Sequence, residues 1–409
     1  MGITVRSFAK INLGLRIGTL RAEGFHQLRT VYQTVALHDV IRVSVGRGSG
    51  IEIRCDDLRV PRDESNTCYR IVGLAMMALK ARGRVVIEIE KRLPVQGGLG
   101  GASGNAVAVL LALERVLKRE LSGPERLRIA AEVGSDLPLF LVGGMVLGVG
   151  RGEEVYPLPD LPAIPCVVAT PDIGVSTPKA FVDWDLLVSR KPQGLEPVSY
   201  GAGGGISEAV PSRAQALSRS HEKILEEHDL SRAGNGDKTS ASAAEGAVEL
   251  RSTWTGEDAR PRAIKDKTAK LTVTAASDRM GEFGRVLSAW LGGLSQGKLK
   301  SGGASTGVPV SKGRGRAETP LLDLVRTGIE NDFERVVFPK YPELREVKSV
   351  LVRAGAVYAS LSGSGSATYG LFASRVAAEK AAARLRKDGI PATATTTLTR
   401  PQYWKKIFD

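Results

Sequence analysis

A run of glycines in the first third of the chain is the segment best suited to bind phosphate. Residues 93–105 read Leu-Pro-Val-Gln-Gly-Gly-Leu-Gly-Gly-Ala-Ser-Gly-Asn. Glycines let backbone N–H groups approach phosphate oxygens without a Cβ in the way, and the positive end of a following helix adds to the attraction. We therefore expect this loop to hold the polyphosphate of a nucleotide, although taken alone it could equally be a tight turn.

The glycine loop matches neither of the two common phosphate-binding fingerprints. Its spacing does not give GxGxxG, and no Lys-Ser or Lys-Thr pair follows it as in the Walker A loop. A near miss to the Walker loop occurs at 292–298, but Leu299 stands where a hydroxyl is required and no strand precedes it. We interpret that second match as chance.

A strand and a helix flank the glycine loop. Val85, Ile87 and Ile89 alternate with less apolar residues over 85–91, which indicates a half-buried strand. After the loop, the apolar residues recur with a period near 3.6: Ala106, Val109, Leu110, Leu113, Val116 and Leu117. The loop is thus predicted to lie at a strand-to-helix junction.

The remaining N-terminal elements are extended segments followed by one helix. Residues 3–45 contain β-rich runs separated by a turn at 21–24, so we expect sheet there. Asn66 can cap a helix whose apolar residues have helical spacing and which Gly83 ends. These elements, together with the glycine junction, predict an N-terminal domain over residues 1–160.

The C-terminal part repeats this mixture of strands and helices. It offers a helix over 321–338, strands on both sides of the loop at 362–366, an alanine-rich helix from Ser374 and a last strand after Pro391. A second domain is therefore expected over 161–409, and the fold class is α+β. Within it, residues from about 187 to 320 are rich in Gly, Ser, Ala and Lys and are predicted to be a largely disordered insertion.

Composition excludes several classes of protein. The net charge of +13 favours anionic partners, such as nucleotides, phosphorylated metabolites or nucleic acid. The three cysteines, Cys55, Cys68 and Cys166, lack the spacing of a zinc or redox site and are expected to be reduced and buried. No apolar run is long enough for a bilayer, and the first residues carry no export pattern. We therefore expect a cytoplasmic protein without a membrane partner.

Five segments in the same order resemble the sequence motifs of the GHMP kinase superfamily. Within that superfamily, the N-terminal segments look like those of kinases that act on a cytidine diphosphate-linked methylerythritol. The resemblance covers roughly residues 5–186 and 321–400. The matching segments are 9–13 with 24–26, 93–104, 134–140, 176–181 and 361–366.

This resemblance implies a fold and a reaction. The fold would be the two-domain GHMP kinase fold, with an N-terminal ribosomal-protein-S5-domain-2-like domain and a C-terminal ferredoxin-like domain. The reaction would be ATP-dependent phosphorylation of the 2-hydroxyl of 4-diphosphocytidyl-2-C-methyl-D-erythritol in the non-mevalonate isoprenoid precursor pathway. The expected cofactors are ATP and Mg²⁺, the expected partner is a small-molecule substrate, and no nucleic acid is expected.

The resemblance also assigns residues to the chemistry. Asp136 would be the catalytic base and Lys10 its cationic partner near the acceptor hydroxyl. A poor alcohol nucleophile needs a group to accept its proton and a positive charge to stabilise the transition state, so these residue types suit phosphoryl transfer.

For the substrate, Phe25 and Phe181 would stack on the two faces of cytosine, His26 would hydrogen-bond the edge of the base, and Asn12 would contact the substrate. The family usually has Tyr where Phe25 stands, so this chain keeps the ring and lacks the hydroxyl.

For the nucleotide, the resemblance implies an ATP site made largely of the glycine loop. Ser103 would be a magnesium ligand. Gln96 stands where the family commonly has Gly, and Ser103-Gly104 stands where it commonly has two serines, so one hydroxyl is missing. The expected ATP-binding residues are Asn66, Pro94, Gly97, Gly98, Leu99, Gly100, Gly101, Ala102, Ser103 and Gly104.

Three other functions fit parts of the sequence. One is a GHMP kinase for homoserine, mevalonate or a sugar, which would share the loop and the base but would lack the cytosine clamp. Another is a basic RNA-binding module, which would need basic and aromatic residues interleaved on one face. The third is a nucleotide binder of weak activity, suggested by the missing loop hydroxyl.

Overall fold

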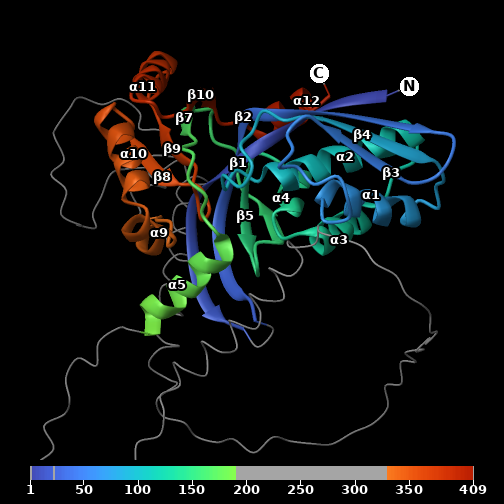
Figure 1. The fold of residues 1–409 in the computed structure, drawn as a ribbon, viewed down its shortest axis with the longest axis horizontal. Coiled ribbons are helices and arrows are strands. Elements are labelled where there is room, and N and C mark those ends of the chain that lie inside the picture. Colours follow the sequence, from blue (N-terminus) through green and yellow to red (C-terminus); the bar gives the residue numbers. More distant parts are fainter. Residues whose placement is uncertain (1, 22–23, 190–328, 409) are drawn as a thin grey trace, which may run out of the picture. The chain divides into compact units, whose positions relative to one another are not determined.

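Two long antiparallel strands, β1 (Gly2–Leu20) and β2 (His26–Gly46), pair along almost their whole length (Figure 1). The computed structural model describes residues 2–21, 24–189 and 329–408, all of which belong to one compact unit. Residues 7–15 of β1 are buried without the usual alternation, because both faces of the strand are covered. Polar side chains on this stretch are therefore removed from water unless they face a site.

The first sheet is built on this hairpin. Its strand order is β3-β4-β2-β5-β6, with β1 paired to β2. β3 and β4 are parallel, and the other neighbours are antiparallel. The added strands are β3 (Ile51–Cys55), β4 (Arg84–Glu90), β5 (Met145–Val149) and β6 (Glu154–Pro157).

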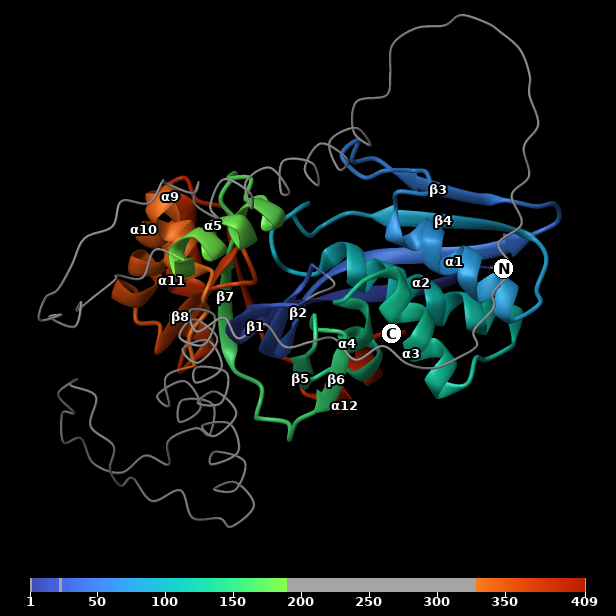
Figure 2. The same cartoon turned by 90° about the horizontal axis from the view of Figure 1, so that it is seen from below.

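Helices α1 to α4 cover one side of the first sheet, as Figure 2 shows. Their bounds are Thr67–Ala78 for α1, Gly101–Leu117 for α2, Gly123–Val133 for α3 and Leu137–Val142 for α4. The core between sheet and helices contains almost every residue of α2 from Ala106 to Leu113. The glycine loop connects β4 to α2, which confirms the predicted strand-to-helix junction.

The second sheet has the strand order β10-β7-β9-β8, and all its neighbours are antiparallel. Numbered along the chain, this is the 4-1-3-2 order of a βαββαβ ferredoxin-like unit, as predicted. The strands are β7 (Pro165–Ala169), β8 (Tyr358–Leu361), β9 (Thr368–Leu371) and β10 (Ala392–Thr396). The helices of this part are α5 (Thr177–Ser189), α9 (Glu334–Lys340), α10 (Pro342–Arg353) and α11 (Arg375–Lys387).

The last helix, α12 (Arg400–Lys406), returns to the first sheet. Tyr403 and Ile407 are buried in the same core as Phe8, and the rings of Phe8 and Tyr403 lie 5.5 Å apart. The expected domain boundary at residue 160 stays a prediction. Residues after 397 belong to the expected second domain, but they pack into the core of the first sheet.

The expected helix over 321–338 is wrong over residues 329–333 and confirmed over 334–338. Residues 329–333 form a bridge and a turn, and the helix begins only at Glu334. Two contacts oppose a helix here. Locally, the Asn331 side chain accepts from the Phe333 amide, and over a long range the backbone at Asn331 pairs with Leu15 of β1. Residues 321–328 lie outside the described residues.

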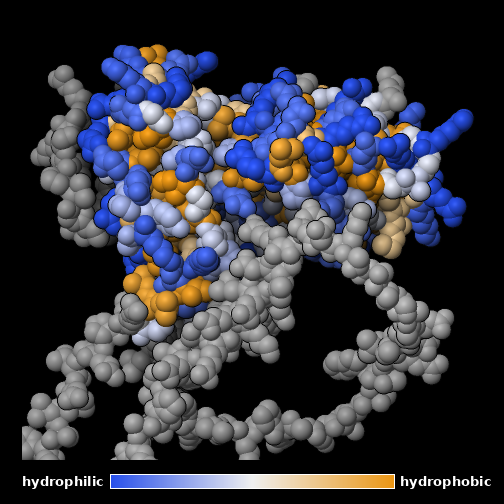
Figure 3. Space-filling view, in the orientation of Figure 1, coloured by the Kyte–Doolittle hydropathy of each residue, from blue (hydrophilic) through white to orange (hydrophobic). Residues whose placement is uncertain are grey.

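Most of the expected disordered insertion, from 190 to 320, also lies outside the described residues, and 187–189 are the end of α5. Figure 3 shows apolar side chains gathered at that end, where Leu186 and Leu187 are exposed.

The three cysteines are free and buried, as predicted. Among the helices that the structure describes, none is long and apolar enough to cross a bilayer.

Candidate active site

Lys10 and Asp136 form a half-buried ion pair at the centre of the molecule. The Lys10 side chain is 4% exposed and its Nζ lies 3.5 Å from Oδ2 of Asp136, which is 34% exposed. Burial lowers the pKa of Lys10, and the negative charge of Asp136 acts in the opposite direction. Asp136 precedes α4 without capping it through its side chain, so its carboxylate is available to the site.

Asn12 and Tyr32 hold this pair from the two strands of the hairpin. Nζ of Lys10 donates to Oδ1 of Asn12 at 2.7 Å, and Nδ2 of Asn12 donates to Oγ1 of Thr30 at 2.8 Å. The Tyr32 hydroxyl donates to Oδ1 of Asp136 at 3.0 Å. Burial first, and then the charge of Asp136, raise the pKa of Tyr32, so its hydroxyl stays a donor. Sequence reasoning missed Tyr32, which lies opposite Asn12 in a hairpin whose register shifts hide that pairing from the sequence.

The glycine loop lies directly on Lys10. The Lys10 amide donates to the carbonyl of Leu99 at 2.9 Å. Gly100 has φ +68°, and a Cβ there would come within 2.9 Å of the Phe140 ring and 3.1 Å of Cγ of Lys10. The loop therefore approaches the catalytic pair as closely as glycine allows.

A second loop, which joins β8 to β9 and comprises residues 362–367, packs against the glycine loop. The Ala367 amide donates to the carbonyl of Gly97 at 3.0 Å, and Oγ of Ser362 donates to the carbonyl of Gly98 at 2.9 Å. Gly98 has φ +73°, and a Cβ there would lie 2.2 Å from the Ser362 carbonyl oxygen. Two of the five sequence motifs thus meet at one backbone contact.

The first turn of α2 follows the loop, so its N-terminal end faces the same site. Gly100 is the N-cap residue, and Ala102 and Ser103 lie in the first turn with part of their surface exposed. The carbonyl of Ala102 accepts from Oγ1 of Thr67, the first residue of α1. Asn66 caps α1 through its side chain, which accepts from the Cys68 amide at 2.8 Å. The two helix N-termini therefore lie beside each other.

Asp39, which sequence reasoning missed, holds both sides of the glycine loop. Its fully buried carboxylate accepts from the Arg92 and Leu93 amides, each at 2.7 Å, and from Nζ of Lys91 at 2.7 Å. It also accepts from Nδ2 of Asn105 in α2 at 3.0 Å. These bonds fix the end of β4 relative to α2, and so fix the span that the glycine loop must bridge.

The residues expected to bind cytosine are only partly brought together. The rings of His26 and Phe181 stack at 5.0 Å with an interplanar angle of 3°. His26 also lies 3.2 Å from the Gly18 carbonyl and 3.3 Å from a carboxylate oxygen of Asp185. Phe25 is 50% exposed, and the Arg151 guanidinium lies 4.7 Å from the centre of its ring.

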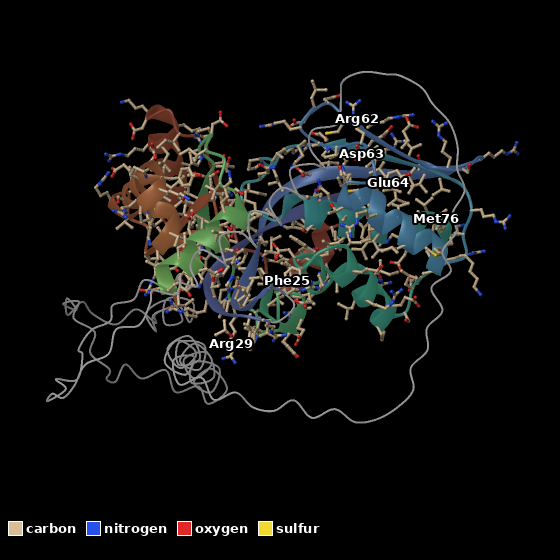
Figure 4. All side chains as sticks on the ribbon, turned by 60° about the horizontal axis from the view of Figure 1, so that its bottom comes forward. Phe25, Arg29, Arg62, Asp63, Glu64 and Met76 are labelled. Carbon is tan, nitrogen blue, oxygen red and sulfur yellow. The ribbon has the colours of Figure 1, made fainter. Side chains whose placement is uncertain are left out.

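Figure 4 separates the two expected ligand sites. Phe25 and Arg29 lie together near the start of β2, and Arg62, Asp63 and Glu64, which lead into Asn66, lie well away from them. Lys10 lies in β1, and Asp136 lies at the start of α4. A nucleotide on the glycine loop and a second ligand at Phe25 would therefore approach Lys10 and Asp136 from different directions.

The residues present suit a magnesium ion that is held mainly by phosphate. Within residues 2–21, 24–189 and 329–408, no group of three or more His, Cys, Asp or Glu side chains could form a protein cage for a metal. Mg²⁺ in phosphoryl-transfer sites is commonly bound by one or two protein oxygens and the substrate phosphates. The Asp136 carboxylate and the Ser103 hydroxyl on α2 are oxygens of this kind.

Two family models match the chain: "GHMP kinases N terminal domain" over residues 66–144 and "GHMP kinases C terminal" over residues 318–390. The 4-diphosphocytidyl-2-C-methyl-D-erythritol kinase of Solibacter usitatus is 31% identical over 384 residues, which are 94% of this chain and 85% of the relative. The enzyme of the same name from Acaryochloris marina is 38% identical over 47% of this chain and 64% of the relative.

A solved structure has the same fold. The crystal structure of a 4-(cytidine 5'-diphospho)-2C-methyl-D-erythritol kinase superposes with a TM-score of 0.57 and 24% identity, covering 97% of this chain and 99% of the other. With a relative 31% identical along nearly the whole chain and both family models matched in order, the protein belongs to the 4-diphosphocytidyl-2-C-methyl-D-erythritol kinase family of GHMP kinases.

Proposed function

We propose that this protein transfers the γ-phosphoryl group of ATP to the 2-hydroxyl of 4-diphosphocytidyl-2-C-methyl-D-erythritol, a step in the non-mevalonate route to isoprenoid precursors. The observation that carries the proposal is the Lys10–Asp136 pair beneath the glycine loop. Homologues that bear this activity in their names support the choice of substrate.

At the catalytic pair, Asp136 accepts the proton of the attacking hydroxyl while Lys10 stabilises the negative charge that develops on the transferred phosphoryl group. Asn12 and Tyr32 keep the two groups in register through the hydrogen bonds given above. Because little covalent chemistry is required of the protein, positioning and charge account for most of the rate.

ATP binds along the glycine loop and the first turn of α2. The backbone of Gly97 to Gly101 surrounds the phosphates, and the positive end of the α2 dipole attracts them. Pro94, Leu99, Ala102 and Gly104 shape the loop, while the α1 N-terminus at Asn66 borders the adenine. Ser103 and Asp136 would offer oxygens to a Mg²⁺ ion held mainly by the phosphates, and that ion would neutralise phosphate charge.

The cytidine part binds at Phe25, His26 and Phe181. Stacking supplies most of the affinity and the polar edge of the base supplies identity. The Phe181 face that stacks on His26 cannot also stack on cytosine, so we propose that His26 turns toward the edge of the base as the base enters. Phe25, half exposed beside Arg151, then closes the second face.

Both substrates are highly charged small molecules, so we propose that the reaction takes place in the cytoplasm and that the net positive charge serves these anions rather than a nucleic acid.

The test is ATP consumption with the purified protein and three alcohols: 4-diphosphocytidyl-2-C-methyl-D-erythritol, homoserine and mevalonate. We expect turnover of the first alone. Phosphorylation of one of the others would reject the cytidine assignment and retain the kinase. ATP binding without turnover of any alcohol would favour the weak nucleotide binder.

A further inference from the structure

The side chains of Asn331 and of Glu334, the first residue of α9, hold the end of β8 and the start of the β8–β9 loop. Nδ2 of Asn331 donates to the carbonyls of Leu361 at 2.9 Å and Gly363 at 2.7 Å. Oε1 of Glu334 accepts from the Leu361 amide and from Oγ of Ser360, both at 2.9 Å. Asn331 is buried, so water cannot take its place as the hydrogen-bond donor to the Leu361 and Gly363 carbonyls.

The β8–β9 loop touches every functional part of the site. Ser362 binds the glycine loop, as described above. A Cβ on Gly363 would lie 3.5 Å from Nζ of Lys10. Oγ of Ser364 lies 2.7 Å from Oγ1 of Thr177, the first residue of the helix that carries Phe181. The loop therefore links the phosphate side, the catalytic pair and the cytidine side.

Asn331 itself is attached to the strand that carries Lys10 and Asn12. Its backbone pairs with Leu15 of β1, where the Leu15 amide donates to the Glu330 carbonyl and the Asp332 amide donates to the Leu15 carbonyl, each at 2.9 Å. The Asn331 side chain thus connects β1 to the β8–β9 loop through one rigid contact.

We propose that Asn331 is a positioning residue for phosphoryl transfer. It fixes the β8–β9 loop relative to β1, and the loop in turn fixes the glycine loop and the start of α5, so that phosphate and acceptor hydroxyl meet at reacting distance. This inference rests on the proposed function for its substrate and on the described contacts for its geometry.

Asn331→Asp is the sharpest test. The carboxylate keeps the oxygen that accepts from the Phe333 amide at 3.0 Å, but it cannot donate to the two carbonyls. We expect kcat per folded molecule to fall about 10- to 100-fold, the scale of a small misplacement of reacting groups, with both KM values within about threefold of wild type. Unchanged kcat per folded molecule would overturn the proposal.

A control variant separates positioning from stability. Val347→Ala opens the core between α10 and the second sheet, in an apolar cluster that contains neither Asn331 nor Leu361. It should lower the melting temperature at least as much as Asn331→Asp and leave kcat per folded molecule near wild type. An equal loss of kcat in both variants would mean that Asn331 acts only through stability.

Ser362→Ala probes the same link from the loop, and it serves alone if Asn331→Asp does not fold. Combined with Asn331→Asp, it should lower kcat by less than the product of the two single effects, because both hold one loop. Multiplicative losses would contradict a shared role.

Hydrogen exchange at residues 97–101 and 362–367 needs no substrate. It should accelerate in Asn331→Asp and stay near wild type in Val347→Ala; equal protection in Asn331→Asp and wild type would overturn the proposal. The two proposals can fail separately. If the wild-type protein phosphorylates homoserine or mevalonate instead, the proposed substrate is wrong. The role of Asn331 is then still decided by hydrogen exchange and by the ratio of kcat between wild type and Asn331→Asp on that alcohol.

Discussion

The catalytic pair and the aromatic group differ in how firmly their side chains are held. Lys10 and Asp136 are fixed by ion-pair and hydrogen-bond contacts to each other, to Asn12 and to Tyr32. In the aromatic group of Phe25, His26 and Phe181, by contrast, Phe25 is half exposed and His26 lies against the ring face that would receive a base.

This difference has a physical reason. Buried charges are stable only when other groups pair or hydrogen-bond with them, so the side chains of a buried ion pair are held in place by their partners. The phenylalanine rings of Phe25 and Phe181 need no such partners and can change position at little electrostatic cost, whereas His26 must exchange its contacts with the Gly18 carbonyl and Asp185 for contacts with the base. We therefore expect the catalytic side to be preorganised and the cytidine side to form as the base binds. The variants below test the two sides separately.

The largest effect is expected for Asp136→Asn. The change keeps the shape of the side chain and removes the negative charge, so the acceptor hydroxyl loses its base. General base catalysis contributes about 10²- to 10⁴-fold, and kcat should fall by that range while ATP affinity changes little. Steady-state kinetics and nucleotide titration measure the two quantities. Near-normal turnover would remove Asp136 from the catalytic step.

Lys10→Met serves as the companion change. It should also lower kcat, and the double variant should lose less than the product of the single effects, because both residues act on one proton transfer and one developing charge.

On the cytidine side, Phe181→Ala should weaken binding of the cytidine substrate by ~1–3 kcal/mol, the scale of one lost base stack, and leave ATP binding nearly unchanged. Calorimetric titration of each ligand measures both values. Phe338→Ala is the control, since Phe338 is buried in the same apolar cluster. If Phe181→Ala weakens both ligands equally, or behaves like Phe338→Ala, its ring is only part of the core.

The pH dependence of kcat should report the environment of Lys10. Burial lowers its pKa, so the ammonium should lose its proton, and kcat should fall, at a pH below the ordinary lysine value of about 10.4. Because the charge of Asp136 opposes this lowering, Asp136→Asn should move the alkaline fall to still lower pH. A pH profile that is the same in both proteins would show that another group titrates.

The smallest effect is expected for Tyr32→Phe. It removes the donor to Oδ1 of Asp136, and one such bond contributes about 1 kcal/mol, or about fivefold in kcat. Tyr403→Phe is the matched control, because the buried Tyr403 hydroxyl donates to the backbone carbonyl of Phe140. That control should lower stability and keep kcat. Equal kinetics in the two variants would remove Tyr32 from the catalytic network.

Sequence alone predicted the parts of the fold that have a local signal. The glycine junction has alternating periodicity on one side and helical periodicity on the other. The strands and helices of the C-terminal part also have local patterns, whereas their ferredoxin-like arrangement was implied by the family resemblance. The helix expected over 321–338 failed at 329–333 because the Asn331 turn depends on β1, more than 300 residues earlier in the sequence. No local pattern contains that contact.

The site shows the same limit. Lys10, Asp136 and the two loops are found together, and their roles remain predictions. Tyr32 and Asp39 were missed because their importance lies in cross-strand register. The hairpin shifts register between Phe8 and Ala9 and again between Asn12 and Gly14, so the residue opposite Asn12 could not be counted from the sequence. The role of Asp39 likewise depends on its hydrogen bonds to Asn105 and to the backbone after β4, which are distant in the sequence.

The strand β1 also sets the order in which the protein can fold during synthesis. Its residues enter three apolar clusters in turn: Val5 and Phe8 the first, Ile11 and Leu13 the second, Leu15 and Ile17 the third. The Arg6 amide donates to the carbonyl of Ile407, which the ribosome adds about 400 residues later. β1 can pair with β2 soon after both are synthesised. The Arg6 end of β1 stays without its Ile407 partner until that residue is made, and the nascent chain must keep this apolar strand from aggregating in the meantime.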